Sequence, residues 1–148
     1  MASKPSLIAV TTLVAALLAG CAGHDDPYSL AATDARAAME SGQLTLIDIR
    51  RPEEWRQTGV AAGSLRINMV HPRGPEGFVA EVLTRLDGNK DAPIGLICRT
   101  GNRTAQARQW LQQRGFTQVY HVGEGMAGSR SGPGWLARGL PTEPCRVC

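Results

Sequence analysis

The chain has 148 residues, the length of one domain with short ends. Hydrophobic residues make up 43% of it, which is enough for a buried core. The formal net charge is only +3 and the basic residues form no run, so composition gives no indication of nucleic-acid binding and at most favours small anionic substrates.

The first twenty residues have the features of an export signal. Lys4 supplies a positive charge, and residues 7–19 form an apolar, small-residue run that is too short for a stable membrane span. The run ends in Leu18-Ala19-Gly20-Cys21, which resembles a bacterial lipobox, whose cysteine is lipidated and becomes the mature N-terminus. We predict a lipoprotein-type signal peptide over 1–20 and a protein exported and lipid-anchored through Cys21 to a bacterial membrane, with its domain in the periplasm or otherwise outside the cytoplasmic membrane. An ordinary secretory signal cleaved nearby is the alternative.

Residues 21–29 are short and polar and contain glycine and proline, which is typical of a tether between a lipid and a folded domain. His24 lies beside Asp25 and Asp26, but the surrounding sequence offers no further metal ligands, so we interpret this segment as solvated linker. The chain has no cofactor motif, and a single Cys-x-x-Cys lacks the second pair that a structural zinc site needs. We therefore predict no metal and no cofactor.

The chain beyond the tether alternates between strand and helix patterns. An apolar run over 44–49 is typical of a strand buried on both faces of a parallel sheet, and Pro52 suits the first position of a helix. Strands that alternate with helices predict an α/β fold with right-handed crossovers and a ligand site at the carboxyl ends of the strands. The other predicted elements are helices over 33–42 and 78–86, a helix closing at Gly115, and strands over 65–69, 94–97 and 119–122.

The central motif joins a short apolar strand to a helix through a polar loop that contains glycine. Backbone N–H groups at a helix N-terminus are unpaired and attract anions. A cysteine that points into this concavity beside Arg99 and Arg103 is favoured as the thiolate, the nucleophilic form. A buried core cysteine is the alternative, but such a residue needs neither arginines nor a glycine loop beside it. The motif reads Cys98-Arg99-Thr100-Gly101-Asn102-Arg103-Thr104.

This motif resembles the active-site loop of the rhodanese-domain sulfurtransferases. In that family the cysteine takes a sulfane sulfur from a donor and holds it as a persulfide, and backbone amides of the loop surround the terminal sulfur. Phosphatases of the same fold carry a Cys-x5-Arg loop that is longer by one residue, whereas Arg103 follows Cys98 with a Cys-x4-Arg spacing. Ile97 also stands where such phosphatases usually carry histidine. The spacing therefore favours sulfur transfer over a weak phosphatase or arsenate-type activity.

The resemblance implies a rhodanese-like three-layer α/β sandwich over residues 30–143, with a central, mostly parallel sheet and helices on both faces. It implies that Cys98 is the catalytic nucleophile, which needs no general base once its loop has ionised it. We assign Arg99 and Arg103 to donor binding; solvated loop arginines, or an Arg103 paired with a nearby carboxylate, are the alternative. The predicted substrate-binding residues are Arg99, Thr100, Gly101, Asn102, Arg103 and Thr104.

A second segment, from Asp48 to Trp55, resembles the Asp-x-Arg signature of the family followed by its Pro-Glu-Glu-aromatic helix start. For Asp48 and Arg50 we prefer structural support to direct catalysis, as an ion pair that fixes the strand end near the active loop. Residues 59–64 lack the histidine and proline that the family usually carries there. Residues 123–128 resemble its glycine-rich loop, and residues 135–143 its usual domain end.

The last segment, 144–148, carries Cys145 and Cys148. With Cys21 assigned to lipid, an odd number of cysteines remains in an oxidising compartment, so one thiol stays free. We predict a Cys145–Cys148 disulfide that leaves Cys98 free. A frayed tail whose cysteines do nothing is the alternative.

The predicted function is that of a sulfurtransferase, which moves a sulfane sulfur from an anionic donor such as thiosulfate to a thiol or cyanide acceptor through a Cys98 persulfide. The alternative is a membrane-tethered persulfide carrier or thiol-redox module with little intrinsic turnover. The predicted partners are the small anionic donor, a thiol acceptor or thiol-reducing protein, and the membrane through the lipid anchor, without nucleic acid.

Overall fold

The computed structural model describes residues 26–148. The predicted signal peptide and Cys21 lie outside the described residues. Within 26–148, no helix is long and apolar enough to cross a membrane. The elements are β1 (Ser29–Leu30), α1 (Ala32–Glu40), β2 (Thr45–Asp48), α2 (Pro52–Thr58), β3 (Val60–Ala61), β4 (Leu65–Arg66), α3 (Gly74–Arg85), β5 (Ile94–Ile97), α4 (Asn102–Gln113), β6 (Val119–Val122), α5 (Gly134–Ala137) and β7 (Thr142–Glu143).

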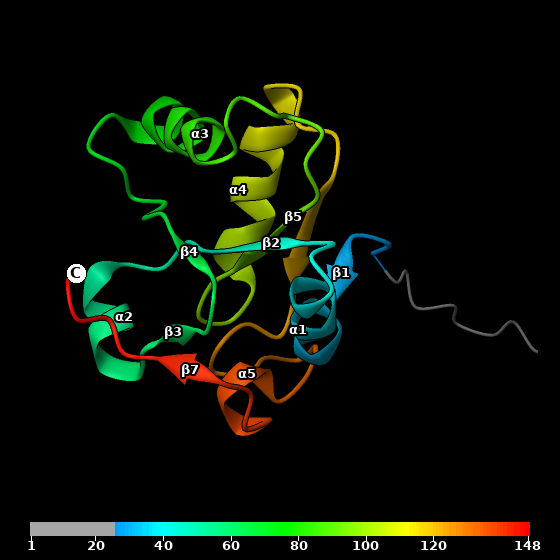
Figure 1. Ribbon diagram of the computed structural model, residues 1–148, viewed down its shortest axis with the longest axis vertical. Helices are drawn as coiled ribbons and strands as arrows, with labels where there is room; N and C mark the ends of the chain where they lie inside the picture. The colour runs from blue at the N-terminus through cyan, green and yellow to red at the C-terminus, as the bar shows by residue number, and fades with distance from the viewer. Residues whose placement is uncertain (1–25) are drawn as a thin grey trace, which may run out of the picture.

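A five-stranded sheet forms the centre of the domain, in the order β1-β6-β5-β2-β4, and all its pairs are parallel. The middle strand, β5, is buried along its whole length, which explains its continuous apolar sequence. A separate antiparallel pair joins β3 to β7, so the end of the chain returns to the region that follows α2 (Figure 1). The predicted mostly parallel α/β sheet is confirmed.

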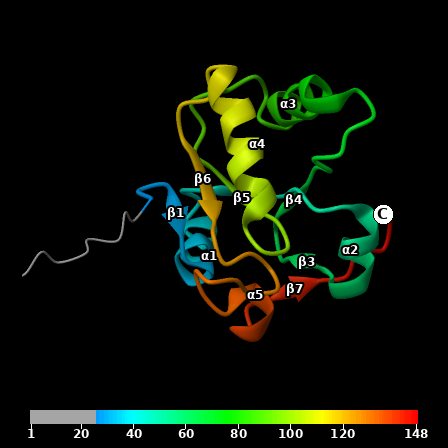
Figure 2. The same cartoon turned by 180° about the vertical axis from the view of Figure 1, so that it is seen from behind.

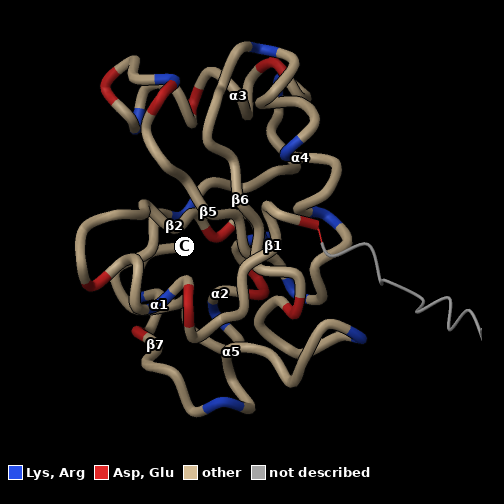
Figure 3. The backbone as a smooth tube through the Cα atoms, turned by 90° about the vertical axis from the view of Figure 1, so that its right-hand side faces the viewer, with Lys and Arg blue, Asp and Glu red and all other residues tan. Residues whose placement is uncertain are grey.

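Helices cover both faces of this sheet (Figures 1 and 2). Alternate residues of a strand face opposite sides, and β5 accordingly contributes to two cores. Ile94 and Leu96 pack with residues of α3 and α4, whereas Ile97 packs with residues of α1 and α5. This three-layer arrangement is the one that the family resemblance implies. Charged residues of both signs are spread over the described domain, as Figure 3 shows.

Several elements differ in extent from the sequence prediction. α3 begins at Gly74 rather than at 78, because Pro75 is compatible with the first turn of a helix. β4 contains only Leu65–Arg66 of the predicted strand 65–69. β1, β3 and β7 were not predicted, since strands of two residues are too short to show a periodic pattern.

Candidate active site

Cys98 lies directly after β5, at the carboxyl end of the middle strand of the sheet. Its side chain is almost fully buried, with 1% exposed, and it is the free cysteine among the described residues. The loop 99–101 leads from it into α4, so Cys98 stands just before the N-terminus of that helix. This edge is where an open parallel α/β sheet binds its ligands.

The backbone of the loop after Cys98 presents unpaired N–H groups. Those of Arg99, Thr100 and Gly101 donate no hydrogen bond to any atom of residues 26–148, and α4 begins without a side-chain cap. Gly101 occupies the N-cap position with a φ of 84°. Unpaired N–H groups next to a helix N-terminus attract negative charge, so the loop can hold a small anion beside the cysteine.

The glycine-rich segment 123–127, which follows β6, fixes the other side of the loop. The backbone N–H of Met126 donates to the carbonyl oxygen of Cys98, and that of Ala127 to the carbonyl oxygen of Arg99, both at 2.9 Å. The carbonyl oxygens of Cys98 and Arg99 therefore accept hydrogen bonds, while the N–H groups of residues 99–101 donate none within the described residues. This asymmetry gives the concavity a positive character.

Arg103 of α4 lies beside Cys98 and is held there by Glu54 of α2. Its Nη1 and Nη2 atoms donate to Glu54 Oε2 and Oε1, each at 2.7 Å. Hydrogen bonding to Glu54 raises the pKa of Arg103, and charge and hydrogen bonding at the Cys98 sulfur raise it further. Burial alone would raise the pKa of Glu54, but hydrogen bonds from Arg103 and from the Arg51 backbone outweigh burial and lower it. Arg103 is thus a fixed cation next to the sulfur, paired with a carboxylate as in the alternative interpretation.

Asp48 and Arg50 form a buried ion pair that connects the end of β2 to the end of α2. Arg50 Nε donates to both carboxylate oxygens of Asp48, at 2.9 and 3.0 Å, and Nη2 donates to Oδ2 at 2.7 Å. The same guanidinium donates to Thr58 Oγ1 and to the Gly59 carbonyl oxygen, both at 2.8 Å. These contacts fix the C-terminal end of α2, the helix that presents Glu54 to Arg103.

Arg99 is exposed on the solvent side of the loop. It lines a pocket of about 200 Å³ between α2 and the segment 123–127, whose walls include Arg50 and Leu136. Among residues 26–148, no carboxylate pairs with the Arg99 side chain. Its charge is therefore available to an anion that approaches the loop.

The remaining loop residues face β6. Thr100, Gly101 and Asn102 line a cavity of about 580 Å³ together with His121. Thr104 is completely buried, and its Oγ1 donates to the Gly101 carbonyl oxygen at 2.6 Å. Thr104 therefore supports the loop backbone from inside.

The comparison with known protein families decides the classification. The rhodanese-like domain matches residues 31–131 of the chain. The chain belongs to the rhodanese-like domain family.

Individual relatives are distant. The uncharacterized protein RP600 of Rickettsia prowazekii is 26% identical over 100 residues, which cover 66% of this chain and 81% of that protein. The solution structure of the polysulfide-sulfur transferase homodimer from Wolinella succinogenes superposes with a TM-score of 0.57 at 28% identity, covering 80% of this chain and 79% of that one. The thiosulfate sulfurtransferase of Pseudomonas aeruginosa has a TM-score of 0.61 at 21% identity, with 80% of this chain and 20% of that one covered, and this likeness concerns the fold alone.

Within this rhodanese-like domain, several polar residues near the loop were not identified from sequence. His121 Nδ1 lies 3.2 Å from Thr104 Oγ1, and its Nε2 lies 3.1 Å from Asp26 Oδ2. Asp26 also accepts a hydrogen bond from Arg108 of α4 at 2.6 Å. Asp26 thus contacts the domain, although it belongs to the predicted tether. His121 is a single polar residue in a strand pattern, so no sequence signal could reveal its partners.

Glu124 is a further buried charge that sequence did not reveal, and it fixes the start of the glycine-rich segment. Glu124 is only 1% exposed. Its carboxylate accepts hydrogen bonds from the backbone N–H groups of Ala32 at 2.6 Å and Gly134 at 2.8 Å, and from Arg138 Nε at 2.9 Å. Burial raises the pKa of Glu124, but the hydrogen bonds from Arg138, Ala32 and Gly134 more than compensate and lower it below its ordinary value of 4.5.

Glu124→Gln should lower the free energy of unfolding by about 2–3 kcal/mol at pH 7, because the amide leaves buried donors without a charged acceptor. A carboxyl with a lowered pKa in the folded state contributes stability that is complete above its unfolded pKa and is lost as pH falls through the folded value. The difference between wild type and variant should therefore shrink in acid. Urea unfolding at several pH values measures it, with the exposed ion-pair variant Glu40→Gln as control, expected to change stability by less than about 0.5 kcal/mol. An equal loss at pH 7 and in acid would contradict this role of the Glu124 charge.

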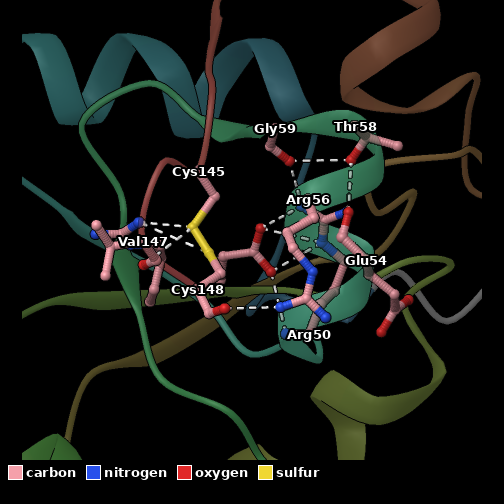
Figure 4. The surroundings of a disulfide bond; sticks show 10 residues. Arg50, Glu54, Arg56, Thr58, Gly59, Cys145, Val147 and Cys148 are labelled. Carbon is pink, nitrogen blue, oxygen red and sulfur yellow. Dashed lines mark hydrogen bonds and ion pairs between the residues drawn. A yellow bond between two sulfur atoms is a disulfide. The ribbon is translucent and has the colours of Figure 1, made fainter.

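The C-terminal segment lies against the domain. β7 pairs with β3, and the Sγ atoms of Cys145 and Cys148 form a disulfide beside α2 (Figure 4). Arg56 of α2 donates to the backbone oxygen of Cys148 at 2.7 Å. The ring closed by the two cysteines is therefore attached to the fold instead of extending into solvent.

Proposed function

We propose that the domain is a sulfurtransferase in which Cys98 accepts a sulfane sulfur from a small anionic donor such as thiosulfate and passes it to a thiol or cyanide. The observation that carries the proposal is the setting of Cys98, which combines the unpaired N–H groups of residues 99–101 with the fixed guanidinium of Arg103. The membership of the rhodanese-like family and the named activity of the Wolinella relative point the same way.

In the first step, the Cys98 thiolate attacks the outer sulfur of the donor. The sulfur–sulfur bond of thiosulfate breaks, and sulfite leaves with the electron pair. The product is a Cys98 persulfide, whose terminal sulfur carries the negative charge. The loop N–H groups stabilise that charge in the manner of an oxyanion hole, and Arg103 faces the inner sulfur.

In the second step, an acceptor thiolate or cyanide attacks the terminal sulfur, and the Cys98 thiolate leaves. The burial of Cys98 restricts this chemistry to small groups, since only 1% of the residue is exposed. A single terminal sulfur atom needs less room than a tetrahedral phosphate. The short Cys-x4-Arg spacing argues for the same selectivity.

Arg99→Ala should weaken donor binding without removing the chemistry. The exposed guanidinium attracts the donor but does not touch the Cys98 sulfur, so we expect KM for thiosulfate to rise about five- to tenfold and kcat to change less than about twofold. Steady-state thiocyanate formation measures both constants. Arg85→Ala, which removes an exposed arginine from the end of α3, is the matched control and should leave both constants unchanged. A wild-type KM for Arg99→Ala would exclude Arg99 from donor binding.

The test of the proposal is the rate of thiocyanate formation from thiosulfate and cyanide. Sustained turnover is expected of an enzyme, and a sulfur-loaded protein that releases its sulfur without turning over would identify the persulfide carrier instead. The exposed Cys145–Cys148 disulfide is the observation that keeps a thiol-redox module as the second candidate.

We also propose that the protein is lipid-anchored outside the cytoplasmic membrane, on the strength of the lipobox-like sequence that ends in Cys21. Cys21→Ala should move the protein out of the membrane fraction of the expressing bacterium, because the acyl chains supply the membrane affinity. Fractionation followed by immunoblotting measures this. A wild-type protein that is soluble and cleaved at another bond would contradict the anchor.

A further inference from the structure

We propose that Cys145 and Cys148 form a second reactive site, a dithiol/disulfide pair that exchanges electrons with an external protein dithiol, and that Arg66 stabilises the thiolate of Cys145. This proposal is independent of sulfur transfer at Cys98. Its basis is the position of the disulfide and the cation that contacts it.

The pair is held in a fixed place on the domain surface. Pairing of β7 with β3 holds the end of the chain against the segment that follows α2, and Arg56 donates to the Cys148 backbone oxygen (Figure 4). Cys148 is exposed, Cys145 is half-buried, and Val147 between them is 87% exposed. An external thiol can therefore reach this disulfide, and it meets the Cys148 sulfur more readily than that of Cys145.

Arg66 contacts the two sulfurs unequally. Its Nη1 lies 2.8 Å from Cys145 Sγ and 3.9 Å from Cys148 Sγ. Among residues 26–148, no carboxylate pairs with Arg66. A disulfide sulfur is a weak acceptor, whereas a thiolate next to a guanidinium is strongly favoured. The contact therefore becomes stronger when the S–S bond breaks and Cys145 carries the negative charge.

Arg66, which contacts the pair, lies two strands away from the residue before Cys98, at the same edge of the sheet. Arg66 pairs with Asp48 across β4 and β2, and Asp48 pairs with Ile97, the residue before Cys98. Two strand spacings, roughly 10 Å in all, therefore separate the backbone of Arg66 from that of Ile97. Because Cys98 is buried and the tail disulfide is accessible, the exchange partner is an external dithiol.

The exchange runs in two displacement steps. A thiolate of the external dithiol attacks Cys148 Sγ, the Cys145–Cys148 bond breaks, and the electron pair leaves on Cys145 beside Arg66. The second thiolate of the dithiol then attacks its own partner sulfur in the mixed disulfide and displaces the Cys148 thiolate. The external dithiol becomes a disulfide, and the Cys145–Cys148 pair gains two electrons, with protons taken up from solvent. A more stable leaving thiolate accelerates the first step.

The experiment follows this exchange in the full chain carrying Cys98→Ser, so that the tail thiols report alone and the result does not depend on sulfur transfer. Protein purified without reductant is mixed with dithiothreitol, quenched with an alkylating reagent, and analysed by peptide mapping. Arg66→Ala should slow reduction about five- to tenfold through loss of the cation at the leaving sulfur, and Arg66→Lys should restore most of the rate. Arg85→Ala, which removes an exposed arginine at the end of α3, should change the reduction rate less than about twofold.

A second arm uses glutathione, a monothiol that stops at the mixed disulfide. We expect the glutathione adduct on Cys148. Reduction of Arg66→Ala at the wild-type rate, or an adduct on Cys145, would overturn the proposal. So would a pair that remains as free thiols in the presence of oxidised glutathione.

Discussion

Cys98→Ser should lose at least about 99% of the sulfurtransferase activity, since removal of a covalent nucleophile normally costs several orders of magnitude. Serine is close to cysteine in size and shape, so the loop, the fold and the Glu54–Arg103 pair should persist. A serine hydroxyl, however, is not ionised at neutral pH and cannot carry sulfane sulfur in this setting. Thiocyanate formation from thiosulfate and cyanide measures the loss, and a urea unfolding curve checks the fold.

The control for this variant is the double substitution of Cys145 and Cys148 by serine, which removes the other described cysteines and should retain wild-type turnover. Residual activity above about one per cent in Cys98→Ser would exclude Cys98 as the nucleophile. Loss of activity in the Cys145/Cys148 double variant instead would show that sulfur transfer takes place at the disulfide.

Gly101→Val should abolish activity and destabilise the domain, for two reasons that can be separated. The φ of Gly101 is 84°, a left-handed conformation that costs a branched residue about 1–2 kcal/mol. A Cβ at this position would also lie 2.1 Å from the carbonyl oxygen of Gly123, so the loop or the glycine-rich segment must move. A displacement of about 1 Å at a reacting group can cost about a hundredfold in rate.

Gly42→Val separates the two effects, because Gly42 has a φ of 71° but no atom within 4 Å of its Cβ position. The control carries the conformational cost alone and should keep wild-type activity, with stability lowered by about 1–2 kcal/mol. Gly101→Val should lose about 3 kcal/mol or more, and its activity should fall at least about a hundredfold. Equal effects of the two variants on stability and rate would show that the close approach of Gly101 to Gly123 has no role in activity or stability.

The strand, loop and helix around Cys98 were predictable because their signals are local. The apolar run of β5, the abrupt change at Cys98 and the glycine of the loop are consecutive in sequence, and the parallel direction of the strands follows from their alternation with helices. The resemblance to the rhodanese family rests on the same short segments. Physical effects over short sequence distances were therefore sufficient for the fold class and for the loop as a candidate site.

The partners of the site were not predictable because they come from distant segments. Glu54 was visible only as an acid in the first turn of a helix, and its pairing with Arg103 spans 49 positions. Glu124 joins the first turn of α1 to the two ends of α5, and its hydrogen bond from the Ala32 N–H spans 92 positions. No periodicity in a single sequence records such contacts, since tertiary packing alone determines them.

The measurement that tests the central claim most directly is the intact mass of the protein after incubation with thiosulfate, followed by peptide mapping without reductant. We predict one added sulfur atom, located on Cys98, absent from Cys98→Ser, and released by cyanide as an equivalent amount of thiocyanate. A wild-type protein that gains no sulfur, or that carries it on Cys145 or Cys148, would contradict the account of Cys98 as the sulfur-accepting residue.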